Sequence, residues 1–410
     1  MTYIEFFSKE LVENICACLV HIPQRIIFIG SDRKKMEKYA QRYHQIFLDR
    51  GYDLELICKS VNRNQLIDIV NLLSEIVEEY DDCIFDLTGG DELMLAATGI
   101  VYERYKDKNI QLQKINLINN IIYDCDADGN IISSDNSSFL SVDENIFMFG
   151  GKVVYEEEKY EGTYRWDWNT EFVNDIRTMW NICKKNVRAW NIQISNLVSI
   201  TSKNTRSEDP LFVETEISDI SNYISGYNNK NNILNELQKH GLINIKKTEH
   251  ISTLTYKNEQ IKRCLTKSGQ VLEMYITLMA LLAKDKDGEK IYNDVKNGVY
   301  IDWDGVVHTG INSFDTGNEI DVLMMRGVIP VFVSCKNGSM DIDELYKLNT
   351  VAAKFGGKYT RKVLITTALT DNDRMTEYIK LRSQDMNIRF VSISQNMTDE
   401  EIQKIISCLW

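Results

Sequence analysis

The feature that most constrains the fold is a regular alternation of short apolar strands and amphipathic helices in the first 105 residues. Strands that alternate with helices of this length form a parallel sheet, because right-handed crossovers return each strand in the same direction. A further strand in 112–123 and a hairpin in 131–155, with its turn at 126–129, extend this sheet. We therefore predict a doubly wound α/β domain. Its first strands and helices are expected at 25–30, 34–50, 53–58, 64–80, 83–87 and 92–105.

The pattern changes after residue 155. An acidic run, Glu156-Glu157-Glu158, leads into an aromatic-rich stretch around Trp166, and the regular alternation stops. The order of elements expected here, helices followed by two short strands, is typical of a winged-helix module. We predict helices at 169–190, 209–225 and 231–240, a polar separator at 201–209, and strands at 242–247 and 251–256.

Alternation of strands and helices returns in the last part of the chain, which predicts a second, compact α/β domain. The boundaries that follow are 1–155, 156–265 and 266–410, and three domains agree with a length of 410 residues at roughly 150 residues per domain. The elements expected in the last domain are helices at 270–283, 341–355 and 371–384, and strands at 298–303, 319–325, 329–335, 362–366 and 387–392.

Composition excludes several classes of protein. Nine cysteines without a CxxC pair argue against a disulfide framework, and five scattered histidines argue against a zinc site. The longest apolar run, Met274–Ala283, is too short to span a membrane, and no signal peptide is recognisable, so we expect a cytoplasmic protein without membrane contact. The 60 acidic and 47 basic residues give a net charge of −13, so any contact with nucleic acid must be local or assisted by metal ions.

A turn with two glycines follows the third predicted strand of the first domain. Glycines let a backbone approach a ligand closely, and the amides of a helix N-terminus attract anions. Ligands of open α/β sheets bind at the carboxyl ends of the strands, where the turn after the first predicted strand also lies. A turn closed by glycines for purely structural reasons is the alternative. The candidate ligand-binding residues are Ser31, Asp32, Arg33, Thr88, Gly89, Gly90, Asp91 and Glu92.

A second group of polar residues lies on a predicted hairpin of the last domain. Glu319 and Asp321 are two apart on one strand, Ser334 and Lys336 are two apart on the next, and Glu273 lies early on an otherwise apolar helix. Residues two apart on a strand leave the same face, so the hairpin brings carboxylates and an ammonium together. Carboxylates suit Mg²⁺ or Mn²⁺, and a lysine beside them can orient water. The alternative is a solvated strand edge with a Glu–Lys pair.

Two stretches resemble a known family. The sequence DLTGGDELMLAATG at 86–99 resembles the ligand loop of CRISPR-associated Rossmann-fold (CARF) domains, and this resemblance covers roughly residues 1–150. It implies a homodimer that binds a cyclic oligoadenylate across its two-fold axis. Many CARF domains carry Thr-Lys after the glycines, whereas this chain has Asp91 and Glu92. Asp91 is expected to cap the following helix, because aspartate is a favoured N-cap residue.

The second stretch, 269–366, resembles the PD-(D/E)xK restriction-endonuclease-like domain that is found fused to CARF sensors. GQVLEMY, NEIDVL, FVSCKNG and KVLIT occur in the expected order. The resemblance implies a metal site, which we assign to Glu273, Glu319 and Asp321 with Mn²⁺ or Mg²⁺, and a lysine, Lys336, that assists the attacking water. Ser334 departs from the pattern, which has an acidic residue there, so one charge is missing.

Together the two resemblances imply an ancillary nuclease of type III CRISPR systems for antiviral defence. Such a homodimer would bind a cyclic oligoadenylate, most often cyclic tetra-adenylate, and then cleave DNA, with RNA as a further substrate. Two alternatives stay open. A CARF-type transcription regulator would use the winged-helix region, although its expected recognition helix carries only one basic residue, Lys239. A catalytically inactive sensor would explain Ser334.

Overall fold

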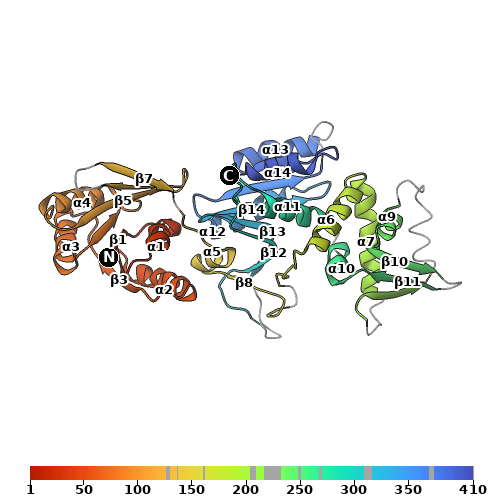
Figure 1. The fold of residues 1–410 in the computed structure, drawn as a ribbon, viewed down its shortest axis with the longest axis horizontal. Helices are drawn as coiled ribbons and strands as arrows, with labels where there is room; N and C mark the ends of the chain where they lie inside the picture. Colours follow the sequence, from red (N-terminus) through yellow and green to blue (C-terminus); the bar gives the residue numbers. More distant parts are fainter. Residues whose placement is uncertain are drawn as a thin grey trace.

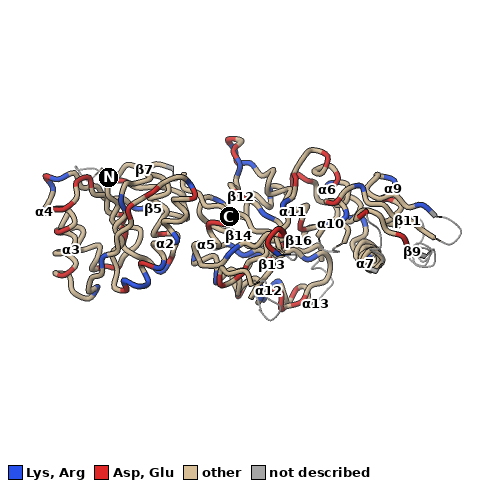
Figure 2. The backbone as a smooth tube through the Cα atoms, turned by 90° about the horizontal axis from the view of Figure 1, so that it is seen from below, with Lys and Arg blue, Asp and Glu red and all other residues tan. Residues whose placement is uncertain are grey.

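The computed structural model describes residues 1–125, 130–135, 137–159, 162–203, 209–216, 232–247, 251–266, 270–308, 316–368 and 374–409. The molecule is elongated, and its described residues form three sheets (Figure 1). The N-terminal sheet lies at one end, the small sheet of the middle segment lies at the other end, and the sheet of the C-terminal part lies between them. Charged residues of both signs are interspersed along the whole length (Figure 2).

The N-terminal sheet has seven strands in the order β3-β2-β1-β4-β5-β6-β7. Strands β1 to β5 run parallel, and β6 and β7 add antiparallel hairpins at one edge. The doubly wound sheet expected from the sequence is thus confirmed, although β1 at its centre was not predicted. The predicted turn at 126–129 lies outside the described residues. The strands are β1 (Thr2–Phe6), β2 (Arg25–Gly30), β3 (Glu55–Ser60), β4 (Cys83–Asp86), β5 (Ile110–Asn116), β6 (Ile121–Cys125) and β7 (Ile131–Asp135).

Helices connect the parallel strands of this sheet. α2 (Arg33–Asp49), α3 (Leu66–Glu79) and α4 (Glu92–Arg104) agree with the predicted helices to within two residues. The connection from β1 to β2 contains a short 3₁₀ helix at Leu11–Asn14 and α1 (Cys16–His21). Because β2 and β3 lie on one side of β1 and β4 lies on the other, the carboxyl end of β1 is the point where the winding direction changes, which is where such sheets bind ligands.

The C-terminal sheet has six strands in the order β16-β15-β14-β13-β12-β8, antiparallel from β8 to β14 and parallel from β14 to β16. Strand β8 and helix α5 (Val142–Met148), which precede residue 156, belong to this body: β8 pairs with β12, and α5 contacts β8 and β12. The strands are β8 (Lys152–Val153), β12 (Asp294–Asp302), β13 (Gly317–Arg326), β14 (Ile329–Lys336), β15 (Arg361–Thr366) and β16 (Arg389–Ser392).

Both faces of this sheet are covered. Val322 and Val333 point to the face that packs against α11 (Gln270–Leu282) and α14 (Asp399–Ser407). Leu323 and Phe332 point to the opposite face, where α5 and α12 (Asp343–Phe355) pack. Strands buried on both faces explain the nearly continuous apolar sequence of β13 and β14. Helix α13 (Arg374–Asp385) also joins the α12 side.

The middle segment differs from the prediction. The predicted helix 169–190 is two elements, because α6 (Thr170–Cys183) ends and the side chain of Asn186 caps the start of α7 (Val187–Lys203). A helix at 209–225 is wrong where the structure describes it: β9 (Phe212–Glu216) pairs with β11, and its buried Val213 and Thr215 flank the exposed Glu214, as in a half-buried strand. The remaining elements are α9 (Ile233–Lys239), β10 (Ile243–Lys247), β11 (Ile251–Tyr256) and α10 (Glu259–Leu265).

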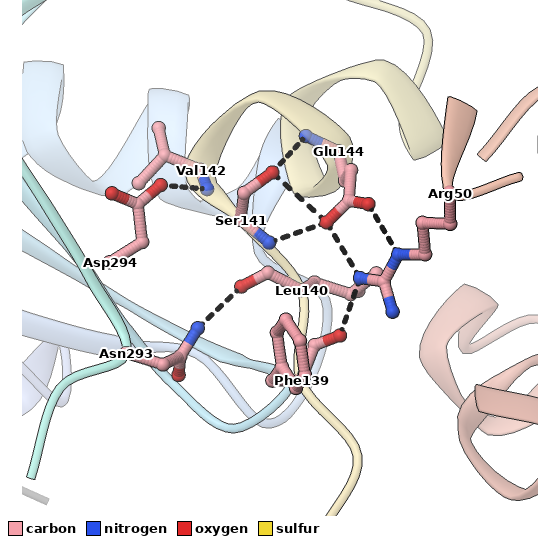
Figure 3. A network of polar contacts seen from close by, with 8 residues as sticks. All are labelled: Arg50, Phe139, Leu140, Ser141, Val142, Glu144, Asn293 and Asp294. Atoms are coloured by element: carbon pink, nitrogen blue, oxygen red, sulfur yellow. Dashed lines mark hydrogen bonds and ion pairs between the residues drawn. The ribbon is translucent and has the colours of Figure 1, made fainter. Parts of the chain in front are cut away.

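The N-terminal and C-terminal bodies meet through buried and half-buried polar contacts. Arg50 at the end of α2 donates from Nε to Oε1 of Glu144 at 2.6 Å and from Nη2 to Oε2 at 2.8 Å (Figure 3). Glu144 also closes the capping box of α5 with Ser141, and the backbone amide of Val142 donates to Asp294 of β12. The arginine therefore contacts a helix that is itself fixed to the C-terminal sheet.

A second contact between these bodies depends on Glu13, whose side chain is buried. Its carboxylate accepts hydrogen bonds from the hydroxyl of Tyr359 at 2.6 Å and from the hydroxyl of Ser8 at 2.6 Å, and it pairs with Lys358 at 2.7 Å. Ser8 follows β1, and Tyr359 precedes β15. Glu13 thus links the central strand of one sheet to a strand of the other. None of the described helices is long and apolar enough to cross a membrane.

Candidate functional sites

A fork between β13 and β14 forms the first site. The two strands are paired from Arg326 and Ile329 up to Val322 and Val333, and beyond this pair each continues along its other neighbour. The polar residues predicted on the hairpin lie just beyond the last pair. We call this region the fork; its residues are Asp321, Ser334, Cys335 and Lys336.

The carboxylate of Asp321 on β13 bonds to residues of β14 across the fork. Its Oδ2 atom accepts a hydrogen bond from the backbone amide of Cys335 at 2.6 Å and one from the hydroxyl of Ser334 at 3.2 Å. Ser334 itself is only 8% exposed. The serine therefore holds Asp321 in place, but it adds no charge of its own.

Lys336 extends past Asp321 toward α12. Its Nζ atom lies 3.0 Å from Oε2 of Glu344 and 3.9 Å from Oδ2 of Asp321. Burial would lower the pKa of Lys336, but Asp321, Glu344 and Glu273 outweigh burial and raise that pKa above its usual value. The ammonium is therefore charged at neutral pH and surrounded by carboxylates.

Glu344 was not predicted as a site residue. It lies in the first turn of α12, and although burial would raise its pKa, the ion pairs with Lys336 and Lys347 lower it below the usual value. The sequence carried a weak signal, an acidic helix start in DIDELYK directly after the hairpin. An acidic first turn is common for helices in general, so the pattern alone did not single out this residue.

Glu273 approaches the fork from the other face of the sheet. It is 4% exposed on α11, and its negative charge acts on both Cys335 and Lys336. Burial, followed by the charges of Asp321 and Glu273, raises the pKa of the Cys335 thiol well above its usual value, so Cys335 is not a nucleophile. The structure thus brings Asp321, Ser334 and Lys336 together, and it places Glu273 on the helix that contacts β13 and β14 from the opposite face.

Glu319 faces a different neighbour. It is exposed, and its Oε1 atom points toward Gly298 of β12, where an added Cβ would lie 3.6 Å away. It lines a cavity of about 300 Å³ together with Gln270, Arg263 and Trp166. The predicted strand position of Glu319 is right, and its carboxylate approaches Gly298, which lies between the partners of Ile320 and Val322 on β12.

The oxygen donors at the fork suit Mg²⁺ or Mn²⁺ in kind. Within the described ranges, however, no three His, Cys, Asp or Glu side chains are gathered closely enough to hold a metal ion. Two of the three assigned carboxylates, Glu273 and Asp321, act on the same lysine, and the third faces the cavity beside β12. The assigned ligand set therefore fits in chemistry, while its closure around an ion stays a prediction.

The glycine turn after β4 forms the core of the second site; we call Thr88, Gly89 and Gly90 the TGG loop. A Cβ atom at Gly89 would collide with the carbonyl oxygen of Phe6, and Gly90 has a φ of +91°, which disfavours other residues. The loop is therefore packed directly onto the carboxyl end of β1. Both glycines have a structural reason to be there, independent of any ligand.

Hydrogen bonds that involve Thr88 and Asp86 hold the TGG loop in place. The backbone amide of Thr88 donates to Oδ1 of Asp86 at 2.7 Å, and the Thr88 hydroxyl accepts from the backbone amide of Ile115 at 2.8 Å. Asp86 is fully buried, and burial raises its pKa to about 7. Hydrogen bonds thus hold the start of the loop in place, while Gly90 at its end is exposed.

The acidic residues around these turns cap helices. Asp91 accepts from the backbone amide of Met94 at 3.0 Å, so the prediction that it is an N-cap residue is confirmed. Asp32 accepts from the backbone amide of Lys35 in the same way. Glu92 lies in the first turn of α4, where a carboxylate stabilises the helix. The presence of these acidic residues beside the TGG loop therefore has a structural explanation.

A cavity of about 600 Å³ lies at the carboxyl ends of β2 and β3. Among its lining residues are Ser31, which the sequence predicted, and Asn62 and Arg63, which it did not. Arg63 also donates from Nε to Asp91 at 2.8 Å, so it connects this cavity to the TGG loop. By contrast, Arg33 pairs with Glu37 on the exposed surface of α2. The polar run SVNRN after a predicted strand could have indicated Arg63, since every strand end of this sheet is a candidate position.

No family model and no curated protein matches this chain. Solved structures do. Protein VC1899 from Vibrio cholerae matches with a TM-score of 0.73 at 16% identity, over 100% of this chain and 96% of that one. Can2 from Sulfobacillus thermosulfidooxidans, solved in complex with cyclic tetra-adenylate, matches with a TM-score of 0.65 at 17% identity, over 99% of both chains. The chain has the fold of Can2.

The likeness to Can2 extends over 99% of both chains, so the α/β fold class expected from the sequence is confirmed. A third structure, a type III CRISPR defence DNA nuclease activated by cyclic oligoadenylate, matches with a TM-score of 0.49 at 11% identity over 45% of its length. That likeness is too low to support a conclusion.

Proposed function

We propose that this protein is a nuclease activated by a cyclic oligoadenylate, with cyclic tetra-adenylate as the first candidate. The observation that carries the proposal is the fork, where Asp321 and Lys336 face each other at 3.9 Å and Glu273 adds its charge. The fold supports it, because Can2, which matches over 99% of both chains, binds cyclic tetra-adenylate. The substrate is DNA, with RNA as a further candidate, in antiviral defence by type III CRISPR systems.

The fork would perform phosphodiester hydrolysis. Glu273, Glu319 and Asp321 would hold Mn²⁺ or Mg²⁺, which when bound stabilises negative charge on the phosphate. The contacts within the fork support roles for the protein's own residues. Ser334 and the amide of Cys335 would orient Asp321 by their hydrogen bonds, and the Lys336 ammonium would bind a phosphate oxygen and orient a water molecule.

The N-terminal sheet would be the sensor. We propose that the TGG loop, Ser31 and Arg63 contact the ligand at the carboxyl ends of β1 to β4, and that Asp32, Arg33, Asp91 and Glu92 border it. A cyclic ligand with internal symmetry suits the two-fold axis of a homodimer. Activation then requires that the ligand binds one arrangement of the two subunits more tightly than the other.

We propose the sensor at 1–155, a winged-helix-like connecting region at 156–265 and the nuclease at 266–410. Helix α5 and strand β8 are the exception within the first range, since they complete the C-terminal sheet. The contacts of Arg50 with Glu144 and of Glu13 with Tyr359 join the sensor to the nuclease within one chain. A ligand-driven movement of the sensor would be transmitted through these contacts.

The test is cleavage of single-stranded DNA, plasmid and RNA with Mn²⁺ or Mg²⁺, with and without cyclic tetra- and hexa-adenylate. We expect cutting that depends on both the metal and one of the activators. Tight binding of an activator without any cutting would contradict the nuclease and indicate a ligand-sensing regulator or an inactive sensor. The panel of substrates would assign the preference between DNA and RNA.

A further inference from the structure

Position 334 lacks the acidic residue that nuclease sites of this kind carry. Ser334 is 8% exposed, and its hydroxyl donates to Asp321, so the position is filled but contributes no negative charge. Lys336, two residues further on, is left with Asp321 at 3.9 Å as its partner within the fork. That distance is longer than a hydrogen bond, so Asp321 attracts the ammonium without fixing its position.

Glu344 supplies a closer carboxylate from outside the hairpin. Its Oε2 atom lies 3.0 Å from the Lys336 ammonium, which is shorter than the distance from that ammonium to Asp321. Its Oε1 atom accepts a hydrogen bond from Lys347 at 3.1 Å. The Glu344 side chain is 21% exposed, so the pair with Lys336 is partly shielded from solvent.

The fold places Glu344 on the correct side of the sheet. Strand residues 332, 334 and 336 share one face, and α12 packs on the face that Phe332 occupies. Glu273, in contrast, belongs to α11 on the opposite face. The carboxylate nearest to Lys336 is therefore on the same side as Ser334, the position where the charge is missing.

Capping of α12 does not explain Glu344. The helix begins at Asp343, its N-cap residue is Ile342, and no side chain caps it. The two carboxylate oxygens of Glu344 point to two lysines, of which Lys336 is half-buried and Lys347 is exposed. A surface ion pair contributes little to stability, so the contact with Lys336 is the one that needs an explanation.

We propose that Glu344 supplies, from helix α12, the carboxylate that position 334 lacks, and that it positions the Lys336 ammonium beside Asp321. The proposal rests on the nuclease function proposed above and adds a residue to that site. Without Glu344 the flexible four-carbon chain of Lys336 can turn to solvent. Misplacement of a catalytic group by about 1 Å can cost on the order of 100-fold in rate.

The experiment compares cyclic-tetra-adenylate-activated cleavage by the wild type, Glu344→Gln and Glu344→Asp. We expect Glu344→Gln to lower kcat about 10- to 100-fold with KM for the nucleic acid nearly unchanged, because Lys336 would be misplaced rather than lost. Glu344→Asp keeps the charge and should retain more activity than Glu344→Gln. A Glu344→Gln variant as active as the wild type, or more active than Glu344→Asp, would overturn the proposal.

A relocation variant tests the replacement itself. Ser334→Glu combined with Glu344→Gln returns the carboxylate to the strand, and we expect it to cleave faster than Glu344→Gln alone. A folded double variant that is no faster would overturn the replacement. Glu377→Gln on α13 is the matched control, since it removes a carboxylate from an exposed lysine pair of the same domain and should leave kcat unchanged.

Thermal unfolding separates these effects from loss of the fold, and all variants are expected to unfold within a few degrees of the wild type. The outcome also separates this proposal from the function on which it rests. If the wild type cuts and only Lys336→Ala fails to cut, the assignment of Glu344 is wrong and the nuclease stands. If the wild type does not cut under any condition, the nuclease is wrong, and Glu344 has no reaction to serve.

Discussion

The fork and the TGG loop were both singled out by the sequence, but the structure explains their residues differently. In the TGG loop, Gly89 avoids a collision with Phe6, and Asp91 caps α4, so the fold itself requires them. At the fork, Lys336 lies close to the carboxylates of Asp321 and Glu344, and all three charged side chains are partly buried. Burying charged groups lowers stability unless they are paired, so a fold gains little from such an arrangement.

This difference shows how to weigh a conspicuous motif. Glycines and acidic residues at strand–helix turns are selected by local backbone geometry, and their presence alone says little about a ligand. A lysine surrounded by carboxylates where two strands separate has no such local reason. We therefore base the function on the fork and use the TGG loop to place the activator.

The largest expected effect is at the fork. Asp321→Asn keeps an acceptor for the amide of Cys335 but removes the negative charge, so we expect cleavage to fall by at least ~100-fold while the protein stays folded. Rates of plasmid and single-stranded DNA cleavage with activator, together with thermal unfolding, would measure both. Cleavage at the wild-type rate would contradict the assignment of Asp321.

In the TGG loop we expect a substitution to lower the stability of the protein, which the substitution at the fork leaves unchanged. Gly89→Ala places a methyl group against the carbonyl of Phe6, and such overpacking typically costs about 1–3 kcal/mol of unfolding free energy. Gly99→Ala in α4 is the matched control, because nothing lies within 4 Å of an added Cβ there. We expect this control to be neutral or to stabilise the helix by about 0.5–1 kcal/mol. Urea unfolding of the two variants would test the difference, and equal stabilities would refute the packing argument.

A smaller effect is expected at the edge of the sensor. Arg63→Gln should weaken the binding of cyclic tetra-adenylate about 10-fold, because a charged hydrogen bond contributes roughly 1.5–3 kcal/mol. Arg33→Gln should change the affinity less, since Arg33 is 66% exposed and paired with Glu37. Isothermal titration calorimetry would rank the two variants. A larger loss for Arg33→Gln would place the ligand over α2 and away from the cavity that Arg63 lines.

The sequence predicted most of the fold because periodicity reports burial. Strands such as β2 and β14 contain runs of apolar residues, and helices such as α2 and α3 show one apolar face, so their positions are correct to within a few residues. The strand β1 was not predicted because its polar residues Thr2 and Glu5 interrupt the apolar pattern, although both are buried. The separation of α6 from α7 escaped because a single cap residue, Asn186, decides it.

The candidate sites were predictable only in part. The alternation of side chains along β13 and β14 correctly put Asp321, Ser334 and Lys336 in one place. It could not show that the two strands separate beyond Val322 and Val333, because the separation depends on the pairing of β13 with β12 and of β14 with β15. Nor could it reveal Glu344 or Arg63, whose contacts join elements that are not strand neighbours of the motifs.

The most direct test of the central claim is cleavage by the wild type and by Lys336→Ala, each with Mn²⁺ and with or without cyclic tetra-adenylate. Binding of the activator is measured on the same samples. The account predicts that both proteins bind the activator equally well and that only the wild type cuts nucleic acid in response to it. Activator-dependent cutting by Lys336→Ala at the wild-type rate would contradict the account, because the reaction would then take place away from the fork.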